Sequence, residues 1–481
     1  MNFIRAILKS FGFSLVLFGT IMLIPAIIDL ASLNRNYKAF LYTSLIGVTI
    51  GTFIKIFNTE EDSKTVKSAF LITVFAWLSG ILYCAIPFII IEPEISVTDA
   101  LFESTSGLTS CGATIFTNLQ EKSKGFLFYR ILLNYIGGVG IVMIGIAILP
   151  SLQIGGMQLF KMEYSDQSKK ILPKVGHIAV NVLIIYFSIT LLGVLFLYSL
   201  GMNFFDALCH GMSAISTGGF TNYDNSITHF NNIKVDLILI LLMILGSQSF
   251  IHYYNITQGN FKEFINDPQT KTFFTIIILA VTSLTFWLHY HQHFDYKTSL
   301  RLASFNAVSI MTTTGFSQGN YDAWGDFPRV LLSVLSLIGG CTGSTSGGIK
   351  LFRLEVTYKV IKYNIRTLLH PHGVFKVYFG DKPLTNNAIS GAISIVILYF
   401  FGLIIGSLLL TLNGLDFMTA ISASISAISN SGFGIGEIIN PDGSYALLPS
   451  FTKIVLTVLM IFGRLEFFTL LVLINPLFWR K

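Results

Sequence analysis

Four short segments of the chain share one pattern: SGLTSCGA (residues 106–113), SAISTGGF (213–220), SIMTTTGF (309–316) and SAISNSGF (426–433). They align on one glycine each: Gly112, Gly219, Gly315 and Gly432. Six residues before this glycine every copy has a serine, and three residues before it every copy has serine or threonine. Because each copy also lies between two long apolar runs, the segments predict four copies of one structural unit.

The apolar runs predict how often the chain crosses a membrane. Ten of them occupy residues 11–30, 39–57, 69–91, 126–149, 177–200, 235–254, 273–288, 330–340, 389–412 and 454–478. About 20 apolar residues cross a bilayer as a helix, which satisfies its own backbone groups. The run at 330–340 is short and continues into GGCTGSTSGG, so we expect an interrupted crossing there. A charged share of 12% excludes an ordinary cytosolic enzyme, since soluble domains average about 25%.

The repeated unit is therefore a helix, a re-entrant segment and a second helix. We expect an all-α polytopic membrane protein, with four helix–pore loop–helix repeats around a pseudo-fourfold pore and an extra N-terminal pair of transmembrane helices. The pair takes residues 1–66, and the repeats take 67–170, 171–265, 266–375 and 376–481. The second helix of each repeat carries a glycine that permits a kink or a close helix approach: Gly137, Gly246, Gly339 and Gly463.

The glycine segments have the chemistry of an ion pathway. Non-helical backbone at membrane depth is tolerated where it lines a cavity, and rings of carbonyl oxygens can replace a cation's hydration shell. Small residues are also common wherever membrane helices pack, but that alternative does not explain four copies in register. The candidate filter comprises Thr109, Ser110, Cys111, Gly112, Ser216, Thr217, Gly218, Gly219, Thr312, Thr313, Thr314, Gly315, Ser429, Asn430, Ser431 and Gly432.

Several longer motifs accompany these segments: ALFESTSGLTSCGAT from Ala100, YIGGVGIVMIGIAILP from Tyr135, GGMQLFKME from Gly155, GGCTGSTSGGIK from Gly339 and GRLEFFTLLVLINPLFW from Gly463. With them the chain resembles the Trk/Ktr/HKT superfamily of potassium transporters, and specifically its Trk-type bacterial membrane subunits. The resemblance implies K+ uptake across the bacterial inner membrane through a four-loop filter that contains the four glycines. It implies K+ as the transported ion and no organic cofactor. It also implies a homodimer bound to a cytosolic ring of nucleotide-binding regulatory subunits.

The glycine-rich stretch after the short apolar run is the candidate gate. Its glycines disfavour a helix, and the resemblance implies a flexible intramembrane loop beneath the filter. A helix-breaking surface turn is the alternative, although lipid would leave its backbone groups unpaired. The candidate gate comprises Gly339, Gly340, Gly343, Ser344, Thr345, Ser346, Gly347, Gly348 and Arg464.

Arg464 lies ten residues into the last apolar run, where a charge is costly and usually faces a cavity. The resemblance implies that it projects into the pore below the filter. Its guanidinium could anchor the gate by hydrogen bonds to carbonyls, or it could form an ion pair with another helix. Glu466 is two positions further on, so the two residues do not share a helical face.

Basic residues predict the orientation of the chain in the membrane. Residues 350–382 hold seven Lys and Arg, and Arg5, Lys9, Lys161, Lys169, Lys170 and Lys174 lie in loops of the same parity. The positive-inside rule then places both termini in the cytoplasm. The 350–382 segment is a candidate docking surface for the regulatory ring or for anionic membrane lipid. No dense basic tract interleaves with aromatic residues, so we expect no nucleic-acid partner.

Other polar residues have more than one interpretation. Four basic residues begin the second helix of each repeat and are expected to snorkel to the outer interface: Arg130, Lys234, Arg329 and Lys453. Glu103 either sits behind the filter or caps a helix. His289, His291 and His293 could bind a metal, but exposed interfacial histidines are the favoured interpretation. Since only such scattered groups are present, we expect no enzyme. Both a channel and a symporter coupled to Na+ or H+ would have this filter, so the choice stays open.

Overall fold

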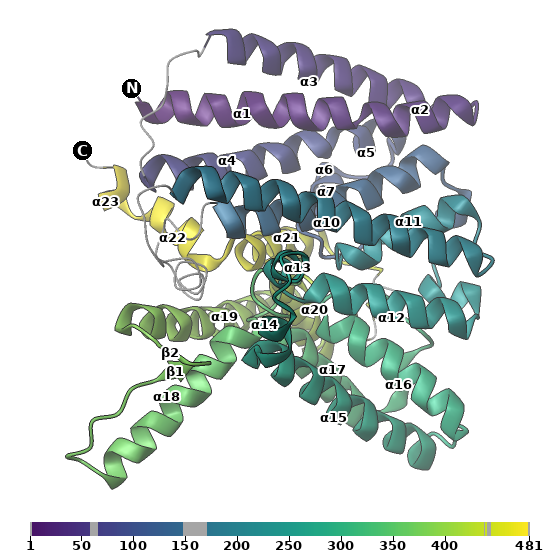
Figure 1. Ribbon diagram of the computed structural model, residues 1–481. Helices are drawn as coiled ribbons and strands as arrows, with labels where there is room; N and C mark the ends of the chain where they lie inside the picture. The colour runs from purple at the N-terminus through teal and green to yellow at the C-terminus, as the bar shows by residue number, and fades with distance from the viewer. Residues whose placement is uncertain (1, 58–65, 148–170, 437, 440–443, 480–481) are drawn as a thin grey trace.

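The computed structural model describes residues 2–57, 66–147, 171–436, 438–439 and 444–479 and is built almost wholly of helices (Figure 1). The chain begins with α1 (Asn2–Ile21), α2 (Leu23–Ala31) and α3 (Tyr37–Phe57). These helices lie together along one side of the bundle (Figure 1). The described chain from Arg5 to Ala31 is long and apolar enough to cross a membrane, and so is α3. They form the expected N-terminal pair.

The rest of the chain repeats one order of elements. The first copy has α4 (Val66–Cys84), α5 (Ile86–Ile91), α6 (Val97–Leu108), η1 (Leu119–Glu121) and α7 (Lys124–Ala147). The second has α10 (Ile171–Ser199), α11 (Phe204–Ile215), η2 (Ser226–Phe230), α12 (Ile233–Ser247), α13 (Phe250–Thr257) and α14 (Phe261–Asn266). Short re-entrant helices α6 and α11 stand between the longer ones, as the sequence pattern predicts.

The third copy has α15 (Pro268–His291), α16 (Tyr296–Met311), η3 (Tyr321–Trp324), α17 (Asp326–Ile338) and α18 (Leu351–Leu369). The fourth has β1 (Tyr378–Phe379), β2 (Lys382–Pro383), α19 (Asn386–Leu412), α20 (Phe417–Ser429), α21 (Ser450–Leu465), α22 (Phe467–Ile474) and α23 (Pro476–Trp479). The two strands pair antiparallel, with Tyr378 opposite Pro383. The expected all-α polytopic fold is confirmed.

Nine of the ten apolar runs correspond to helices or bent helix pairs of membrane-spanning length, and the tenth is the interrupted crossing that the sequence predicts. Within the described residues seven helices are long and apolar enough to span a membrane, and two bent helix pairs bring the total to nine. The run at 235–254 bends by 91° between α12 and α13, and the run at 454–478 bends by 107° between α21 and α22. The run at 330–340 gives the 13-residue α17, which stops at Gly339 as an interrupted crossing.

The glycine that recurs in the second helix of each repeat has a steric cause. A Cβ added to Gly137, Gly246 or Gly463 would overlap the carbonyl oxygen four residues before the filter glycine of the same repeat. These oxygens belong to Leu108, Ile215 and Ile428. In the third repeat Gly339 instead faces the carbonyl of Gly347. The predicted close approach is therefore present in repeats 1, 2 and 4. In the third repeat the loop after α17 packs on the glycine instead.

The helical bundle has its chain ends on one side. Helix α1 begins and α23 ends at the same end of the bundle (Figure 1). Helix α18 and the β1–β2 pair project from the bundle, and α18 follows directly from the glycine-rich loop (Figure 1). One large apolar cluster joins the first and fourth repeats through residues such as Phe102 and Ile428. A second joins the second and third repeats through residues such as Ala214 and Phe305.

Candidate functional site

Short helices position the four candidate filter segments, which are residues 109–112, 216–219, 312–315 and 429–432 and are called filter segments 1 to 4 in this order. Each of α6, α11, α16 and α20 starts at a side chain that accepts a hydrogen bond from a backbone N–H of the first turn. These caps are Ser96, Asn203, Asp295 and Asp416. Such side chains satisfy donors that the helix itself leaves unpaired. The opposite ends of the four helices carry the negative end of the helix dipole, and they point into the filter segments, where it favours cations.

All four helices end in the same hydrogen-bond motif. The N–H of the residue before the filter glycine donates to the carbonyl of the repeated serine, at 2.8 to 3.0 Å in the four copies. The donors are Cys111, Gly218, Thr314 and Ser431. This is the Schellman motif, which requires a left-handed residue just after the helix. The filter segments are thus extensions of rigid helix ends.

Two left-handed residues shape each filter segment. The filter glycines have φ between 66° and 86°, a region that glycine adopts readily. Two residues earlier, φ lies between 49° and 57° at Ser110, Thr217, Thr313 and Asn430. For Thr217 and Thr313, which are β-branched, this conformation costs roughly 1–2 kcal/mol. The sequence places these four residues in the candidate filter but does not indicate their left-handed conformation, because only Asn430 has a residue type typical of a left-handed helix end.

The four segments close into a ring. A Cβ on Gly112 would overlap the carbonyl oxygen of Gly218, and a Cβ on Gly219 would overlap that of Thr314. The same relation joins Gly315 to the carbonyl of Ser431, and Gly432 to that of Cys111. Each filter glycine thus packs on the carbonyl that precedes the glycine of the next repeat, and the fourth repeat returns to the first. A side chain at any of these positions would displace a neighbouring segment.

A cavity of about 260 Å3 opens directly onto this ring. Gly112, Gly219, Thr117 and Asp224 contribute to its wall. Asp224 accepts a hydrogen bond from the N–H of Leu119 at 3.1 Å and is only partly buried. A partly exposed carboxylate at a concave mouth raises the local concentration of cations.

Arg130 corrects the prediction of four interfacial anchors. It is fully buried, and its Nε lies 2.7 Å from Oε1 of Glu103. Its guanidinium also stacks on Phe220, 4.2 Å from the ring centroid. Glu103 accepts from the N–H of Ile115 at 2.9 Å, so it sits behind the first filter segment and does not cap a helix. Glu103 stands 27 residues away from Arg130 in the sequence. Arg130 is therefore buried beside Glu103 and does not snorkel to the membrane interface.

The other three basic residues differ among themselves. Lys453 is also buried, and its Nζ lies 2.6 Å from Asp99, so the prediction is wrong for it as well. Arg329 is partly buried and lies 2.9 Å from a carboxylate oxygen of Asp322. Lys234 is exposed, as expected for an anchor.

The candidate gate, residues 339–348 and called the gate loop below, is buried along its whole length, which excludes the surface-turn alternative. It is hydrogen bonded to the helix ends of three repeats. The hydroxyl of Thr345 donates to the carbonyl of Ile215 at 3.1 Å, and that of Ser346 donates to Thr312 at 2.8 Å. The N–H of Gly348 donates to the carbonyl of Ser429 at 3.0 Å. The loop therefore lies directly against the backbone from which filter segments 2, 3 and 4 emerge.

Arg464 links the gate loop to the remaining repeat. Its Nη1 donates to the carbonyl of Thr345 at 2.9 Å. Its Nη2 donates to Oγ of Ser110 at 3.2 Å and to the carbonyl of Gly137 at 2.9 Å. The side chain is buried, and no carboxylate in the described part of the chain pairs with it, so the ion-pair alternative is not supported. The structure thus brings Arg464 together with both groups of predicted site residues.

Glu466 instead pairs with Arg353 of α18. Glu466 has a φ of 61°, and the chain turns there from α21 into α22. Both Lys350 and Arg353, which follow the gate loop, are buried and not exposed at a membrane boundary. The break at Glu466 has no signal in the apolar pattern of the sequence.

The remaining sequence candidates form no site. No group of three potential metal ligands occurs among the described residues. His291 stacks on Trp287 at the end of α15, with ring centroids 4.0 Å apart. His291 and His293 are exposed, and His289 is partly buried. The four cysteines are free and buried. Lys161, Lys169, Lys170 and the GGMQLFKME motif lie outside the described residues, as does the side chain of Lys174.

A closed ring of four re-entrant segments within a bundle of membrane-length helices defines a polytopic membrane transport protein. The sequence profile of the TrkH family, described as a cation transport protein, matches residues 36–480. The chain belongs to this family, and the predicted resemblance is confirmed.

Individual relatives agree over most of their length. The Trk system potassium uptake protein TrkI of Halomonas elongata is 38% identical over 417 residues, which cover 86% of this chain and 84% of that protein. The Trk system potassium uptake protein TrkH of Escherichia coli K12 is 33% identical over 486 residues and 99% of both chains. The crystal structure of the potassium transporter TrkH from Vibrio parahaemolyticus superposes with a TM-score of 0.91 at 32% identity. It covers 99% of this chain and 100% of that chain.

Proposed function

We propose that this protein takes up K+ across the bacterial inner membrane through the ring formed by filter segments 1 to 4. The observation that carries the proposal is the cyclic packing of Gly112, Gly219, Gly315 and Gly432 on the carbonyls of their neighbours. Backbone oxygens gathered in this way can replace the hydration shell of a cation. The names of the relatives, which are potassium uptake proteins and a potassium transporter, favour K+ as that cation.

The electrostatics of the pathway favour cations on its filter side. Asp224 stands at the mouth beside Gly112 and Gly219. The four helix C-termini add partial negative charge, each contributing up to about 1 kcal/mol of attraction. An ion that loses water in the ring exchanges it for fixed carbonyl dipoles. We therefore assign the filter role to the segments and the recruiting role to Asp224.

The gate loop and Arg464 close the pathway below the ring. The loop is held by hydrogen bonds to Ile215, Thr312 and Ser429, each worth a net of about 1 kcal/mol. Its residues are almost all glycine, serine and threonine, so its displacement exposes little apolar surface. Water in an opened pathway would replace its hydrogen bonds. The positive charge of Arg464 adds a barrier to cations that moves with the loop, because Arg464 holds the carbonyl of Thr345.

We further propose a homodimer with both termini in the cytoplasm, bound to a cytosolic nucleotide-binding ring. The positions of α1 and α23 at one end of the bundle support a shared side for the termini (Figure 1). Helix α18 begins three residues after the gate loop, and Lys362 and Arg366 are exposed on it. A partner that moved α18 would pull directly on the loop. We also propose that the chain divides into an N-terminal helix pair, residues 1–66, and four repeats that end at residues 170, 265, 375 and 481.

Cation flux into liposomes tests this function. The protein would be reconstituted with its cytosolic partner, and uptake of K+, Rb+, Na+ and Li+ compared under a fixed membrane potential. Potential-driven flux of K+ and Rb+ far above Na+ and Li+, without a Na+ or H+ gradient, is expected. Flux that required such a gradient would favour the symporter alternative. Equal passage of Na+ and K+ would contradict the filter.

A further inference from the structure

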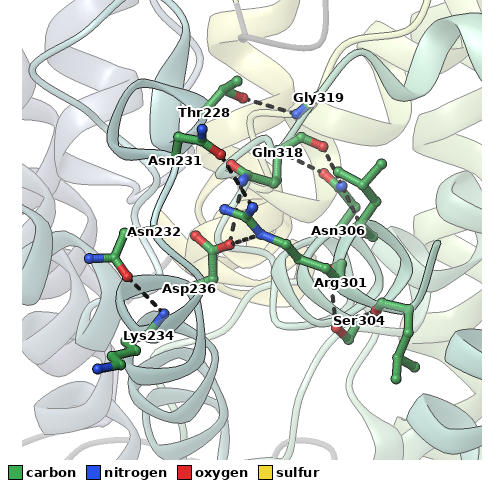
Figure 2. A network of polar contacts seen from close by, with 12 residues as sticks. Thr228, Asn231, Asn232, Lys234, Asp236, Arg301, Ser304, Asn306, Gln318 and Gly319 are labelled. Atoms are coloured by element: carbon green, nitrogen blue, oxygen red, sulfur yellow. Dashed lines mark hydrogen bonds and ion pairs between the residues drawn. The ribbon is translucent and has the colours of Figure 1, made fainter. Parts of the chain in front are cut away.

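We infer that Asp236 and Arg301 are positioning residues for filter segment 3 and that they contribute to discrimination between K+ and Na+, an inference that rests on the proposed function. Figure 2 shows the carboxylate of Asp236 facing both Arg301 and Gln318. The three residues come from α12, from α16 and from the chain just beyond filter segment 3. The cluster therefore joins the second repeat to the third beside the ring.

The ion pair at the centre of the cluster is well buried on its acidic side. Nε of Arg301 lies 2.6 Å from Oδ2 of Asp236, with side-chain exposures of 21% and 2%. Nη1 of Arg301 also donates to the side-chain oxygen of Asn231 at 3.3 Å. Asp236 stands in the first turn of α12, where the helix dipole favours negative charge. The helix dipole and Arg301 both favour the charged form of this carboxylate, and its contacts hold Arg301 and Gln318 in one geometry.

Gln318 connects this pair to the filter. It stands three residues beyond Gly315, and its side-chain amide donates to Oδ2 of Asp236 at 3.4 Å. Its backbone is held on both sides by Asn306 of α16. The N–H of Gln318 donates to the Asn306 oxygen at 3.1 Å, and its carbonyl accepts from the Asn306 amide at 2.8 Å. Asn306 is fully buried, so this pair of hydrogen bonds to the Gln318 backbone is shielded from water.

The neighbouring backbone is fastened to the second repeat as well. The N–H of Ser317 donates to the hydroxyl of Ser226 at 3.1 Å, and the N–H of Gly319 donates to that of Thr228 at 2.9 Å (Figure 2 draws the latter). The carbonyl of Ser317 accepts from the N–H of Ile227 at 3.3 Å. The exit of filter segment 3 is thus docked along η2 and cannot shift without breaking bonds to the second repeat.

The first repeat has a parallel arrangement. Glu103 and Asn306 both stand nine residues before their filter glycine, and both accept from the N–H three residues after it. Each connects to an ion pair, Glu103–Arg130 in one case and Asp236–Arg301 through Gln318 in the other. The corresponding residues of repeats 2 and 4 are His210 and Ala423. The two clamped segments, 1 and 3, lie opposite each other in the ring.

This placement explains how the pair acts on ions that it does not touch. The carbonyl of Thr314 packs on Gly219, so a shift of segment 3 changes the spacing of the ring's oxygens. A ring that is held apart resists contraction around the smaller Na+ ion. Loss of the Asp236 charge frees Gln318 and Arg301 and lets segment 3 relax inward.

The test measures reversal potentials with K+ on one side of a planar bilayer and Na+ on the other. Asp236→Asn, Arg301→Gln and the double variant would be compared with the unmodified full chain and its cytosolic partner. Glu92→Gln is the matched control, since the Glu92–Lys122 pair has the same 2.6 Å separation and its carboxylate lies outside this network. We expect a several-fold fall in the K+/Na+ permeability ratio for each single variant, no further fall for the double variant, and no change for the control.

Unchanged permeability ratios in conducting Asp236→Asn and Arg301→Gln proteins would overturn the inference, and so would an equal fall in Glu92→Gln. Where Asp236→Asn fails to assemble, Gln318→Met removes only the side-chain amide, and an unchanged ratio in that variant overturns the inference equally. If the unmodified protein itself does not distinguish K+ from Na+, the proposed function fails instead.

Discussion

Arg464, in the fourth repeat, donates a hydrogen bond from Nη2 to the hydroxyl of Ser110 in filter segment 1, at 3.2 Å. The same guanidinium holds the gate loop through the carbonyl of Thr345. The loop's own hydrogen bonds reach the helix ends of repeats 2, 3 and 4 through Ile215, Thr312 and Ser429. Arg464 therefore completes a set of bonds that ties the loop to all four repeats, and it connects the candidate gate with the candidate filter.

Replacement of Arg464 should increase basal K+ flux. Arg464→Ala removes a buried positive charge from the proposed pathway and releases the carbonyl of Thr345. Two like charges about 6 Å apart repel by roughly 3 kcal/mol at an effective dielectric constant near 20. We expect flux through the reconstituted protein to rise by up to about a hundredfold, since each 1.4 kcal/mol is worth a factor of ten. Arg464→Lys, which keeps the charge, should rise less. A loss of folded protein without any rise in flux would argue for a purely structural arginine.

Loosening of the gate loop should also increase basal K+ flux and should leave the K+/Na+ selectivity unchanged. Thr345→Val keeps the shape of the side chain but removes the hydroxyl whose single proton is shared between the carbonyls of Gly246 and Ile215. With about 1 kcal/mol lost with this donor, we expect a several-fold rise in basal flux. Thr342→Val is the matched control, because the Thr342 hydroxyl is buried without a hydrogen-bond partner among the described residues. Equal flux in the two variants would count against the loop as a gate.

A side chain at Gly112 should weaken discrimination against Na+. Gly112→Ser places a Cβ against the carbonyl of Gly218 and forces a non-glycine residue to adopt a φ of 86°. Backbone strain alone is controlled by Gly201→Ala, since Gly201 has a φ of 99° and open space around it. We expect a several-fold lower K+/Na+ permeability ratio for Gly112→Ser and a ratio like the parent's for Gly201→Ala. Matching ratios in both variants would refute the packed ring.

The buried ion pair behind filter segment 1 should matter far more for stability than an exposed one. Glu103→Gln leaves Arg130 buried without its charge partner, which costs roughly 3–5 kcal/mol. Glu92→Gln breaks a pair with side-chain exposures of 23% and 26%, and such pairs contribute about 0–1 kcal/mol. Thermal unfolding in detergent should show a large loss of stability for Glu103→Gln alone. Equal small shifts would mean that Arg130 is solvated.

The repeat architecture is readable from the sequence because it repeats at long range. Gly112 and its three counterparts occupy equivalent places between apolar runs, and the second-helix glycines such as Gly246 follow at similar distances. These patterns reflect local requirements for a positive φ and for close approach to a carbonyl. Local requirements of this kind leave a signature in the residue types themselves.

The features that the sequence does not indicate depend on tertiary partners. The position of Arg130 near a helix start predicts an interfacial anchor, but the side chain is buried in an ion pair with Glu103. The bend at Glu466 lies within the last apolar run, and the residue that pairs with Glu466 there, Arg353, stands 113 positions away in the sequence. The left-handed conformation of Thr217 belongs to the end of α11, where the chain turns into the ring. None of these partners stands near in the sequence.

The most direct test of the ring is the position of a bound ion. Crystals of the protein grown with Rb+ in place of K+ would give an anomalous signal for the ion. The account predicts a peak on the pore axis, enclosed by the carbonyl oxygens of Cys111, Gly218, Thr314 and Ser431, and its loss when Na+ replaces Rb+. A ring without Rb+ while the ion binds elsewhere in the protein would contradict the central claim.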